Sequence, residues 1–339
     1  MNKTPLLGKT LNELKAIASE LGMPAFTGKQ LSEWIYKIKV WEIDEMTNIS
    51  VSNRAKLNEL YVVGKTKPEL QQESVDGTVK YLFKTEKGHL IESVFIPEED
   101  RATLCISSQV GCKMNCSFCM TGKQGFSAQL TAHEILNQFY SIPESELLTN
   151  IVFMGMGEPL DNVSNVMRTL EILTADYGQA WSPKRITVSS IGLIPGMKVF
   201  LEGSECHLAI SMHSPFDEER LKLMPVQKPY PIEKVLEELK KYDFSKQRRV
   251  SFEYIMFDDL NDTKRHAIQM LKLLRGISCR VNLIRFHAIP GVDLKTSTDE
   301  KMVAFRDYLS NNGLLCTIRK SRGEDIFAAC GMLSSSKRS

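Results

Sequence analysis

From residue 101 onward, strand-like and helical segments alternate along this chain of 339 residues. Six runs read as strands, with amphipathic helical segments between them; the runs are residues 103–107, 150–154, 185–189, 207–211, 250–256 and 280–286. A helical return after each strand makes consecutive strands pair in parallel. The alternation therefore predicts an α/β fold whose parallel sheet curls into a partial (βα)6 barrel.

Several of the intervening helices carry clear local signals. Thr131 and Glu134 form the pattern of a capping box directly before the apolar residues Ile135 and Leu136. Residues 163, 166, 167 and 170 make one apolar stripe at helical spacing, and residues 232, 235, 236 and 239 make another. Each stripe predicts a helix with one side packed on the sheet.

The unusual residues of the chain fall where these strands end. A cysteine-rich loop follows the first strand, and Gly-Met-Gly-Glu-Pro at 155–159 follows the second. Residues 189–192, 211–213 and 286–287 end the third, fourth and sixth strands. Ligands bind at the carboxyl ends of parallel strands in barrels and open sheets. We therefore expect one functional site along this edge.

Three cysteines in the first of these loops, Cys112, Cys116 and Cys119, have the spacing CxxxCxxC. Three thiolates can hold one metal centre, but they supply one ligand fewer than a closed four-cysteine site. A centre held in this way keeps a coordination position for an external ligand. The alternative is a structural zinc site completed by Cys105, although such sites usually contain two separated CxxC pairs.

Polar residues at the other strand ends suit a small charged ligand. The carboxylate of Glu158 can pair with an ammonium group, and Gly155 and Gly157 let a ligand approach the backbone closely. Ser189 and Ser211 are hydrogen-bonding groups at the same edge. Each of these residues taken alone is equally an ordinary turn or capping residue.

Two further thiols lie outside the loop. Cys105 belongs to the first strand, and Cys330 follows the last one, between the small residues Ala329 and Gly331, which would admit a bulky substrate to its sulfur. The remaining cysteines sit among apolar neighbours and are expected to be buried small hydrophobes; they are Cys206, Cys279 and Cys316.

The composition is that of a globular protein of a reducing compartment. Hydrophobic residues make up 42% and charged residues 25% of the chain, and no apolar stretch has the length of a signal peptide or membrane span. Eight cysteines in such a chain favour metal binding or thiol chemistry over structural disulfides. We therefore expect a cytoplasmic protein without membrane contact.

A net charge of +2 neither requires nor excludes a nucleic-acid partner. The basic residues gather in two runs, either of which can bind phosphate or form a solvated surface: Lys246, Arg248 and Arg249, and Arg319, Lys320 and Arg322.

The chain is expected to divide into four parts. Residues 1–62 form a helical accessory domain, with lysines suited to RNA, and 63–97 a short β extension or linker. Residues 98–325 form the catalytic barrel, and 326–339 a C-terminal segment that carries Cys330 and ends in a disordered Ser/Lys/Arg tail.

Taken together, the motifs resemble those of the radical S-adenosylmethionine (SAM) adenine C2 methyltransferases of bacterial 23S rRNA and tRNA. The matching segments lie within residues 10–333; they are 106–112, 153–160, 212–215, 282–284, 318–323 and 328–331. The resemblance implies a radical-SAM barrel and two substrates. These are an adenosine in the peptidyl transferase centre and the adenosine 3′ of the anticodon in certain tRNAs.

The resemblance also implies a mechanism that uses five cysteines. Cys112, Cys116 and Cys119 hold one [4Fe-4S] cluster, which binds SAM and generates a radical with an electron from an external one-electron reductant. Cys330 first accepts a methyl group from another SAM, so each turnover uses two. Cys105 releases the product by forming a transient disulfide with Cys330.

The remaining site residues are assigned from the same likeness. Glu92 matches a proton acceptor, although by sequence alone it is an exposed strand carboxylate. The SAM contacts implied are Gly157, Glu158, Ser189, Ser211, Met212, His213 and His287. The family often has asparagine where this chain has His287, which introduces a titratable group there.

Two alternatives stay open. A sister family methylates C8 of the same rRNA adenosine with similar cysteines, but it has alanine at the position of Pro159. The other alternative is a non-catalytic, zinc-containing RNA-binding protein. The enzyme is expected to act as a monomer.

Overall fold

The computed structural model describes residues 3–245 and 248–334, and within them ten strands form one open sheet. Its order is β14-β13-β12-β11-β10-β9-β6-β5-β4-β3. All neighbouring pairs from β6 to β14 are parallel. These strands are β6 (Ala102–Cys105), β9 (Asn150–Phe153), β10 (Ile186–Ser190), β11 (His207–Ser211), β12 (Val250–Met256), β13 (Cys279–Arg285) and β14 (Cys316–Ile318).

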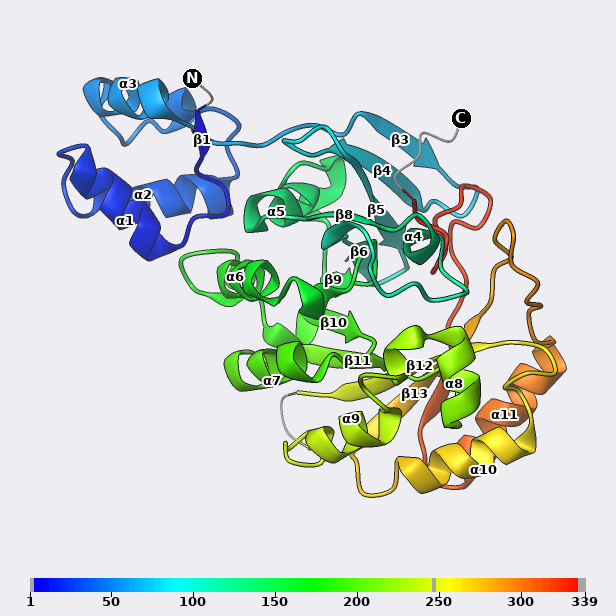
Figure 1. Ribbon diagram of the computed structural model, residues 1–339. Helices are drawn as coiled ribbons and strands as arrows, with labels where there is room; N and C mark the ends of the chain where they lie inside the picture. The colour runs from blue at the N-terminus through cyan, green and yellow to red at the C-terminus, as the bar shows by residue number, and fades with distance from the viewer. Residues whose placement is uncertain (1–2, 246–247, 335–339) are drawn as a thin grey trace.

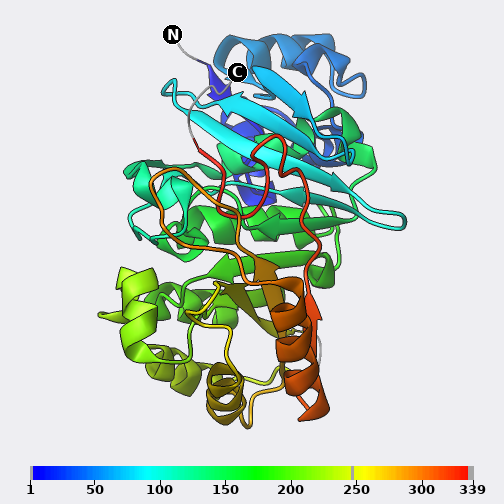
Figure 2. The same cartoon turned by 90° about the vertical axis from the view of Figure 1, so that its right-hand side faces the viewer.

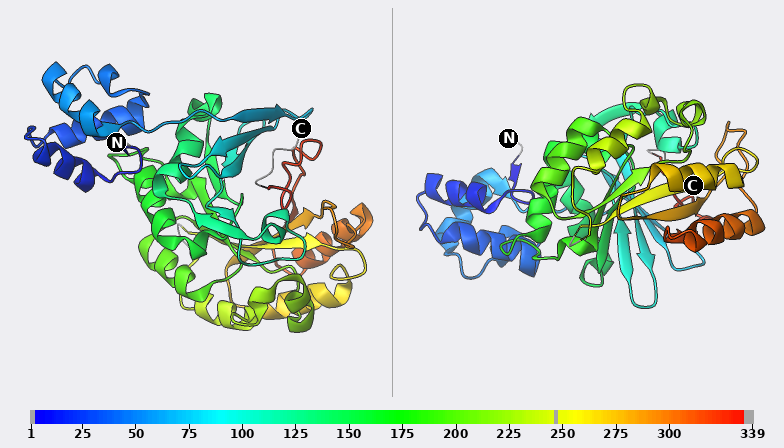
Figure 3. Two further views of the ribbon diagram at one scale, coloured as in Figure 1. Left: turned by 45° about the horizontal axis from the view of Figure 1, so that its top comes forward. Right: turned by 90° about the horizontal axis from the view of Figure 1, so that it is seen from below.

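Helices follow the parallel strands and cover the outer side of the curved sheet (Figures 1 and 3). They are α5 (Ala132–Tyr140), α6 (Val163–Thr174), α7 (Ile194–Gly203), α8 (Asp217–Leu223), α9 (Ile232–Leu239), α10 (Lys264–Leu273) and α11 (Asp299–Asn311). The expected capping box opens α5, and the apolar stripe of α9 is buried. The six strand–helix units of the partial barrel are therefore confirmed.

The sheet continues beyond the barrel through three antiparallel strands, seen clearly in Figure 2. They are β5 (Leu90–Pro97), β4 (Val79–Lys84) and β3 (Leu70–Glu73). The boundary expected at residue 97 falls inside the β5–β6 hairpin, so the β extension and the barrel share one sheet. A separate two-stranded sheet joins β7 (Gln109–Gly111) to β8 (Phe126–Gln129), with the short helix α4 (Met120–Lys123) between them.

The N-terminal residues form a helical module beside the barrel, at the upper left of Figure 1. Its strands β1 (Thr4–Pro5) and β2 (Tyr61–Val62) pair in parallel and bring its two ends together. Its helices are α1 (Leu11–Glu20), α2 (Thr27–Glu33) and α3 (Val51–Leu60), and α2 continues into a π-helical turn, η1 (Trp34–Ile38). Leu14, Leu31 and Ile35 are buried in the module's core.

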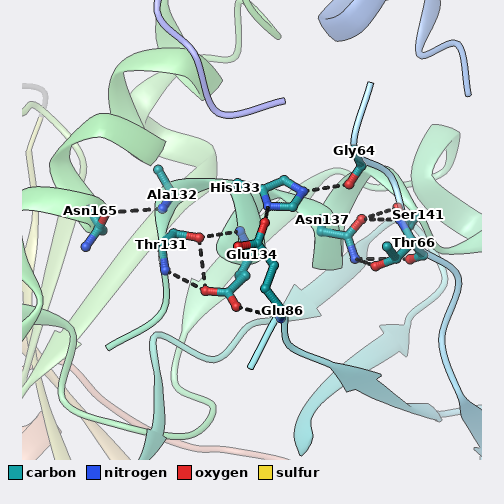
Figure 4. A network of polar contacts seen from close by, with 10 residues as sticks. All are labelled: Gly64, Thr66, Glu86, Thr131, Ala132, His133, Glu134, Asn137, Ser141 and Asn165. Atoms are coloured by element: carbon teal, nitrogen blue, oxygen red, sulfur yellow. Dashed lines mark hydrogen bonds and ion pairs between the residues drawn. The ribbon is translucent and has the colours of Figure 1, made fainter. Parts of the chain in front are cut away.

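A polar network fixes the segment after this module to α5 (Figure 4). The side-chain amide of Asn137 donates to the carbonyl and hydroxyl of Thr66 at 3.0 and 2.8 Å, and its oxygen accepts the Thr66 N–H at 2.8 Å. Nε2 of His133 lies 2.6 Å from the carbonyl of Gly64. The linker is therefore held to the barrel by specific contacts with one helix.

After β14 the chain runs back toward β3 and β4, along the open side of the barrel (Figure 1). Asp325 accepts a hydrogen bond from the Ser74 hydroxyl at 2.6 Å, and Asp76 accepts one from the Gly323 N–H at 3.0 Å. Of the tail after Leu333 that was expected to be disordered, Ser334 is buried and hydrogen-bonded to Glu92, whereas residues 335–339, like Lys246, lie outside the described residues. Within the described part of the chain, no helix is long and apolar enough to cross a membrane.

Candidate functional site

The cysteine loop is anchored at its first residue by the β7–β8 hairpin. The Cys112 N–H donates to the carbonyl of Gly125 at 2.9 Å. Gly111 has φ +74°, and a Cβ there would lie 1.8 Å from that same carbonyl oxygen. Glycine is therefore required at the entrance of the loop.

One cavity, of about 150 Å³, collects most of the expected site residues. The three cysteines of the loop line it together with Cys330. The ends of β9, β10 and β11 contribute the polar part of the lining: Gly157, Glu158, Ser189, Ser211 and His213. Apolar side chains, including Phe118 and Ile255, form the remaining wall. The residues expected at the carboxyl edge of the sheet thus come together at one place.

The donor set of this cavity fits an iron–sulfur cluster with one iron left for an external ligand. Burial raises the pKa of Cys112 to about 12 and that of Cys116 well above its usual value. Such thiols ionise only when positive charge, such as that of bound metal, compensates them. Within residues 3–245 and 248–334, no three His, Cys, Asp or Glu side chains are arranged to hold a metal ion.

Glu158 is buried in the same cavity as the loop cysteines, and its carboxylate is held by backbone hydrogen bonds. Its two oxygens accept the backbone N–H groups of Leu160 at 3.1 Å and Ile191 at 3.0 Å. Burial nevertheless raises its pKa to about 7, because these hydrogen bonds offset only part of the desolvation. A cationic group in the cavity would favour the ionised form. Glu158 is thus suited to bind an ammonium group.

The two glycines before Glu158 line the cavity and also allow two segments of backbone to pack closely. A Cβ on Gly157 would lie 2.4 Å from Cβ of Gln109, and one on Gly155 would lie 2.7 Å from the backbone of Ile106. Oε1 of Gln109 also accepts the Glu158 N–H at 2.8 Å. The glycines therefore allow the β9 end to pack on the chain leading into the cysteine loop, which positions Glu158.

His213 presents a neutral imidazole to the cavity. Its Nδ1 accepts the Ile255 N–H at 2.9 Å, so the ring proton is on Nε2. Burial, with a smaller effect of Arg220, lowers its pKa to about 3. The ring also packs edge-on against Phe118 of the cysteine loop, with centroids 4.8 Å apart. His213 can thus donate one hydrogen bond while supporting the loop.

Arg220, which the sequence analysis missed, is fully buried beneath these strand ends. Its guanidinium donates to the carbonyls of Ser211 at 3.1 Å, Met212 at 3.2 Å and Ile191 at 3.0 Å. It therefore fixes the ends of β10 and β11. The side chain of Met212 itself is buried in the main core and does not line the cavity.

A second cavity, of about 250 Å³, contains the two outlying thiols. Cys105 and Cys330 both line it, with Arg319 and His287. Cys330 lines both cavities, and so do Met154 and Ile284. The Cys330 residue therefore lies between the cysteine-loop cavity and the cavity that contains Cys105, on the segment that follows β14.

The charges around the two outlying thiols favour Cys330 as the more readily ionised one. Burial and the neighbouring Cys330 raise the pKa of Cys105 to about 12, and Arg319 opposes this rise more weakly than the hydrogen bond to the backbone of Met154 does. Burial also raises the pKa of Cys330, although the residue as a whole is exposed, and the Arg319 guanidinium opposes that rise. Arg319 belongs to a basic run that the sequence left open as a solvated surface. The structure instead places it among the thiols.

Two expected site residues lie elsewhere. His287 lines the second cavity and not the one with the loop cysteines; its Nε2 is 3.0 Å from the Ser321 hydroxyl. Glu92, on β5, lines neither cavity. It is buried, pairs with Lys80 at 3.1 Å and accepts the Ser334 N–H at 2.8 Å. The alternative considered from the sequence, that Glu92 is an exposed carboxylate on a strand, is therefore wrong.

Comparisons with known proteins agree over the full length of the chain. Residues 106–271 match the Radical SAM superfamily, and residues 4–63 match the ribosomal RNA large subunit methyltransferase N-terminal domain. A relative from Parabacteroides distasonis, described as a probable dual-specificity RNA methyltransferase RlmN, is 63% identical, with 99% of this chain and 98% of the relative covered. The dual-specificity RNA methyltransferase RlmN of Syntrophus aciditrophicus is 40% identical, with 98% and 97% covered.

A solved structure gives the same result for the fold. The crystal structure of a radical SAM methyltransferase from Sphaerobacter thermophilus superimposes with a TM-score of 0.92 at 36% sequence identity. The superposition covers 98% of this chain and all of the other chain.

Proposed function

We propose that this chain, which belongs to the radical-SAM family of dual-specificity RNA methyltransferases, methylates adenine at C2 in two RNAs. The targets are the adenosine in the peptidyl transferase centre of 23S rRNA and the adenosine 3′ of the anticodon in tRNAs. The observation that carries the proposal is the position of Cys330 between the cavity of the loop cysteines and the cavity of Cys105.

The cofactors have a natural place in the first cavity. Cys112, Cys116 and Cys119 would hold the [4Fe-4S] cluster, and SAM bound with it supplies the radical chemistry that the non-nucleophilic C2 of adenine requires. Glu158 binds the ammonium group of SAM, and Ser189, Ser211 and the Nε2 proton of His213 complete the hydrogen bonding.

Cys330 carries the methyl group in this proposal. Its thiolate, favoured by Arg319, attacks the methyl carbon of one SAM molecule, so that a new S–CH₃ bond forms while the sulfonium–methyl bond breaks and S-adenosylhomocysteine leaves. A second SAM serves as the radical source, so each turnover consumes two. The radical supplied by that SAM would remove one hydrogen from the S-methyl group, and the resulting carbon radical adds to C2 while it is still attached to the Cys330 sulfur. The adduct then gives up one electron, which balances the electron used to cleave the second SAM, and loses the C2 proton.

Cys105 resolves this covalent enzyme–RNA species. Its thiolate attacks the Cys330 sulfur, an S–S bond forms, and the S–C bond breaks with its electron pair remaining on carbon, which takes up a proton. Two electrons and two protons from an external reductant restore both thiols. Glu92 is the proposed acceptor of the proton leaving C2. Lys80 and the Ser334 N–H hold its carboxylate in this conformation, in which it lines neither cavity.

The test is an anaerobic assay of the reconstituted protein on 23S rRNA fragments and on tRNA, with chromatography and mass spectrometry of the digested nucleosides. We expect 2-methyladenosine from both RNAs. Detection of 8-methyladenosine instead would overturn the assignment to C2, and a colourless, air-stable protein that consumes no SAM would overturn the enzymatic proposal.

Three variants test the two thiols. Cys330→Ala should abolish methylation, because no sulfur remains to carry the methyl group. Cys105→Ala should accumulate a covalent protein–RNA adduct, visible as a slower band on a denaturing gel. Cys279→Ala is the matched control, since Cys279 lines neither cavity, and it should retain activity. Normal turnover of Cys105→Ala without an adduct would refute the two-thiol scheme.

We also propose that the enzyme is cytoplasmic, because two of its thiols must be reduced again in each catalytic cycle and the cytoplasm is a reducing compartment.

A further inference from the structure

A third cavity lies on the inner face of the barrel, toward the amino ends of the strands. It measures about 190 Å³, and four arginines line it: Arg101, Arg249, Arg280 and Arg319. Polar side chains such as Asn282 and Thr317 line it as well, together with a few apolar ones such as Val152 and Leu208. We call it the arginine cavity.

The position of these arginines is unusual for the inside of a barrel. Closed α/β barrels fill their interior with layers of bulky branched side chains. Here the inward positions along β12 and β13 hold polar residues: Ser251 and Glu253 on one strand, and Arg280 and Asn282 on the other. The interior is thus hollow and polar where packing alone would favour valine or isoleucine.

The positive charge in this cavity is only partly balanced. Its carboxylate, Glu253, is buried, and Oε1 accepts hydrogen bonds from Ser251 and Asn282. Its other oxygen lies 3.7 Å from Arg319 and has no hydrogen-bond partner. Among the described residues, Arg101, Arg249 and Arg280 form no ion pair within 4 Å.

The arginines also act on one another. Burial, and then the charge of Arg249, lower the pKa of Arg280, and Arg101 and Arg319 add smaller effects in the same direction. The same repulsion contributes to the lowered pKa of Arg101. Like charges that line one cavity repel one another, and an anion between them would reduce that repulsion.

The cavity adjoins the thiols directly. Arg101, Val152, Met154 and Arg319 line both the arginine cavity and the cavity that contains Cys105 and Cys330. A nucleotide whose base reaches the thiols therefore has its backbone close to the arginines. Guanidinium groups bind phosphate oxygens through paired hydrogen bonds, and phosphate contacts fix the register of a nucleic acid on a protein.

We propose that the arginine cavity binds a backbone phosphate of the substrate RNA adjacent to the target adenosine. This inference rests on the proposed function. It assigns Arg249 and Arg280, which line neither thiol cavity, to substrate positioning.

The first experiment measures RNA affinity as a function of salt. The probe is a stem–loop RNA with the target adenosine in its loop, and the protein is the reconstituted full chain. Arg249→Gln and Arg280→Gln should each weaken binding by about tenfold, since a charge-assisted hydrogen bond is lost, and each should reduce the slope of log affinity against log salt by about one. Arg280→Lys should recover part of the loss.

The second experiment identifies the phosphate. In a series of RNAs, each linkage next to the target adenosine is replaced in turn by a neutral methylphosphonate, with the adjacent 2′-hydroxyl removed for stability. One such linkage should weaken binding to the wild type about tenfold but have much less effect on Arg280→Gln, because the two changes remove the same contact. The matched control is Arg275→Gln, an exposed arginine just beyond α10.

The outcomes separate this inference from the proposed function. If the wild type methylates RNA but both arginine variants keep wild-type affinity and salt slope, the arginine cavity does not bind the substrate. The same conclusion follows if the losses from the variants and from every methylphosphonate are additive. If the wild type neither binds nor methylates RNA, the proposed function itself fails.

Discussion

The carboxyl group of Glu158 makes the stability of the cofactor-free protein depend on pH. Its pKa is raised from 4.5 to about 7, so the folded protein keeps a proton that the unfolded chain has already lost between these values. The free energy of unfolding should therefore fall as pH rises through this interval, by an amount on the order of 3 kcal/mol from this group. Urea denaturation at several pH values measures it.

Glu158→Gln isolates the effect. The variant cannot titrate at this position, so the difference in unfolding free energy between it and the wild type should shift in its favour as pH rises from about 5 to 8. A constant offset is also expected, because the glutamine amide would face a backbone N–H that now donates to a carboxylate oxygen. A difference independent of pH would show that Glu158 is ionised throughout.

Some site residues could be predicted from the sequence, and others could not. Cys112 and Glu158 could be recognised because each belongs to a continuous motif. Arg319 could not be distinguished from a solvated arginine, because its neighbours Cys105 and Glu253 are distant in the chain. Glu92 is buried only because Lys80 on the adjacent strand and the backbone of Ser334 compensate its charge. Such pairings depend on tertiary structure.

The β7–β8 hairpin sets the position of the cysteine loop, and Gly111 is its most constrained residue. Gly111→Ala would put a Cβ 1.8 Å from the Gly125 carbonyl at φ +74°, so we expect a destabilisation of roughly 2–4 kcal/mol and a marked loss of bound iron after reconstitution. Iron and sulfide content per chain, with the visible absorbance of the cluster, measure the loss.

Gly88→Ala provides the matched control for this substitution. Gly88 also lies in a hairpin, at φ +82°, but a Cβ there meets nothing within 4 Å. Gly88→Ala should lower the free energy of unfolding only by the backbone strain, about 1 kcal/mol, and should leave the iron content unchanged. Equal iron content in both variants would mean that the entrance of the loop does not determine cluster binding.

Long periodic segments were predicted well and short ones were not. The six strand–helix units have enough alternating or apolar residues to identify them, and α9 buries the stripe that predicted it. β14 has three residues and β3, Leu-Gln-Gln-Glu, is mostly polar and exposed, so neither has a detectable pattern. Both are strands because a neighbouring strand supplies hydrogen bonds. The same dependence on neighbours explains why the arginine cavity, assembled from several strands, was not foreseen.

The complete set of reacting groups comes from one chain, so the protein should act as a monomer. The loop cysteines, both outlying thiols and the arginine cavity are assembled without a second copy. Sedimentation at assay concentrations should give a mass near 38.4 kDa, and activity per chain should be independent of protein concentration. A dimer whose dissociation abolishes activity would contradict this expectation.

The hydrogen bonds between Thr66 and Asn137 have a consequence for how an RNA is chosen. Because they fasten to α5 the linker that directly follows the N-terminal module, they help to fix the distance between the module and Cys330. An RNA that touches the module must then present its adenosine at that same separation, whatever its overall size. Two very different molecules, a ribosomal segment and a tRNA, satisfy this requirement if they share only the local distance between a folded stem and one accessible base. The enzyme would then select its RNA substrates by the distance between the stem and the accessible base.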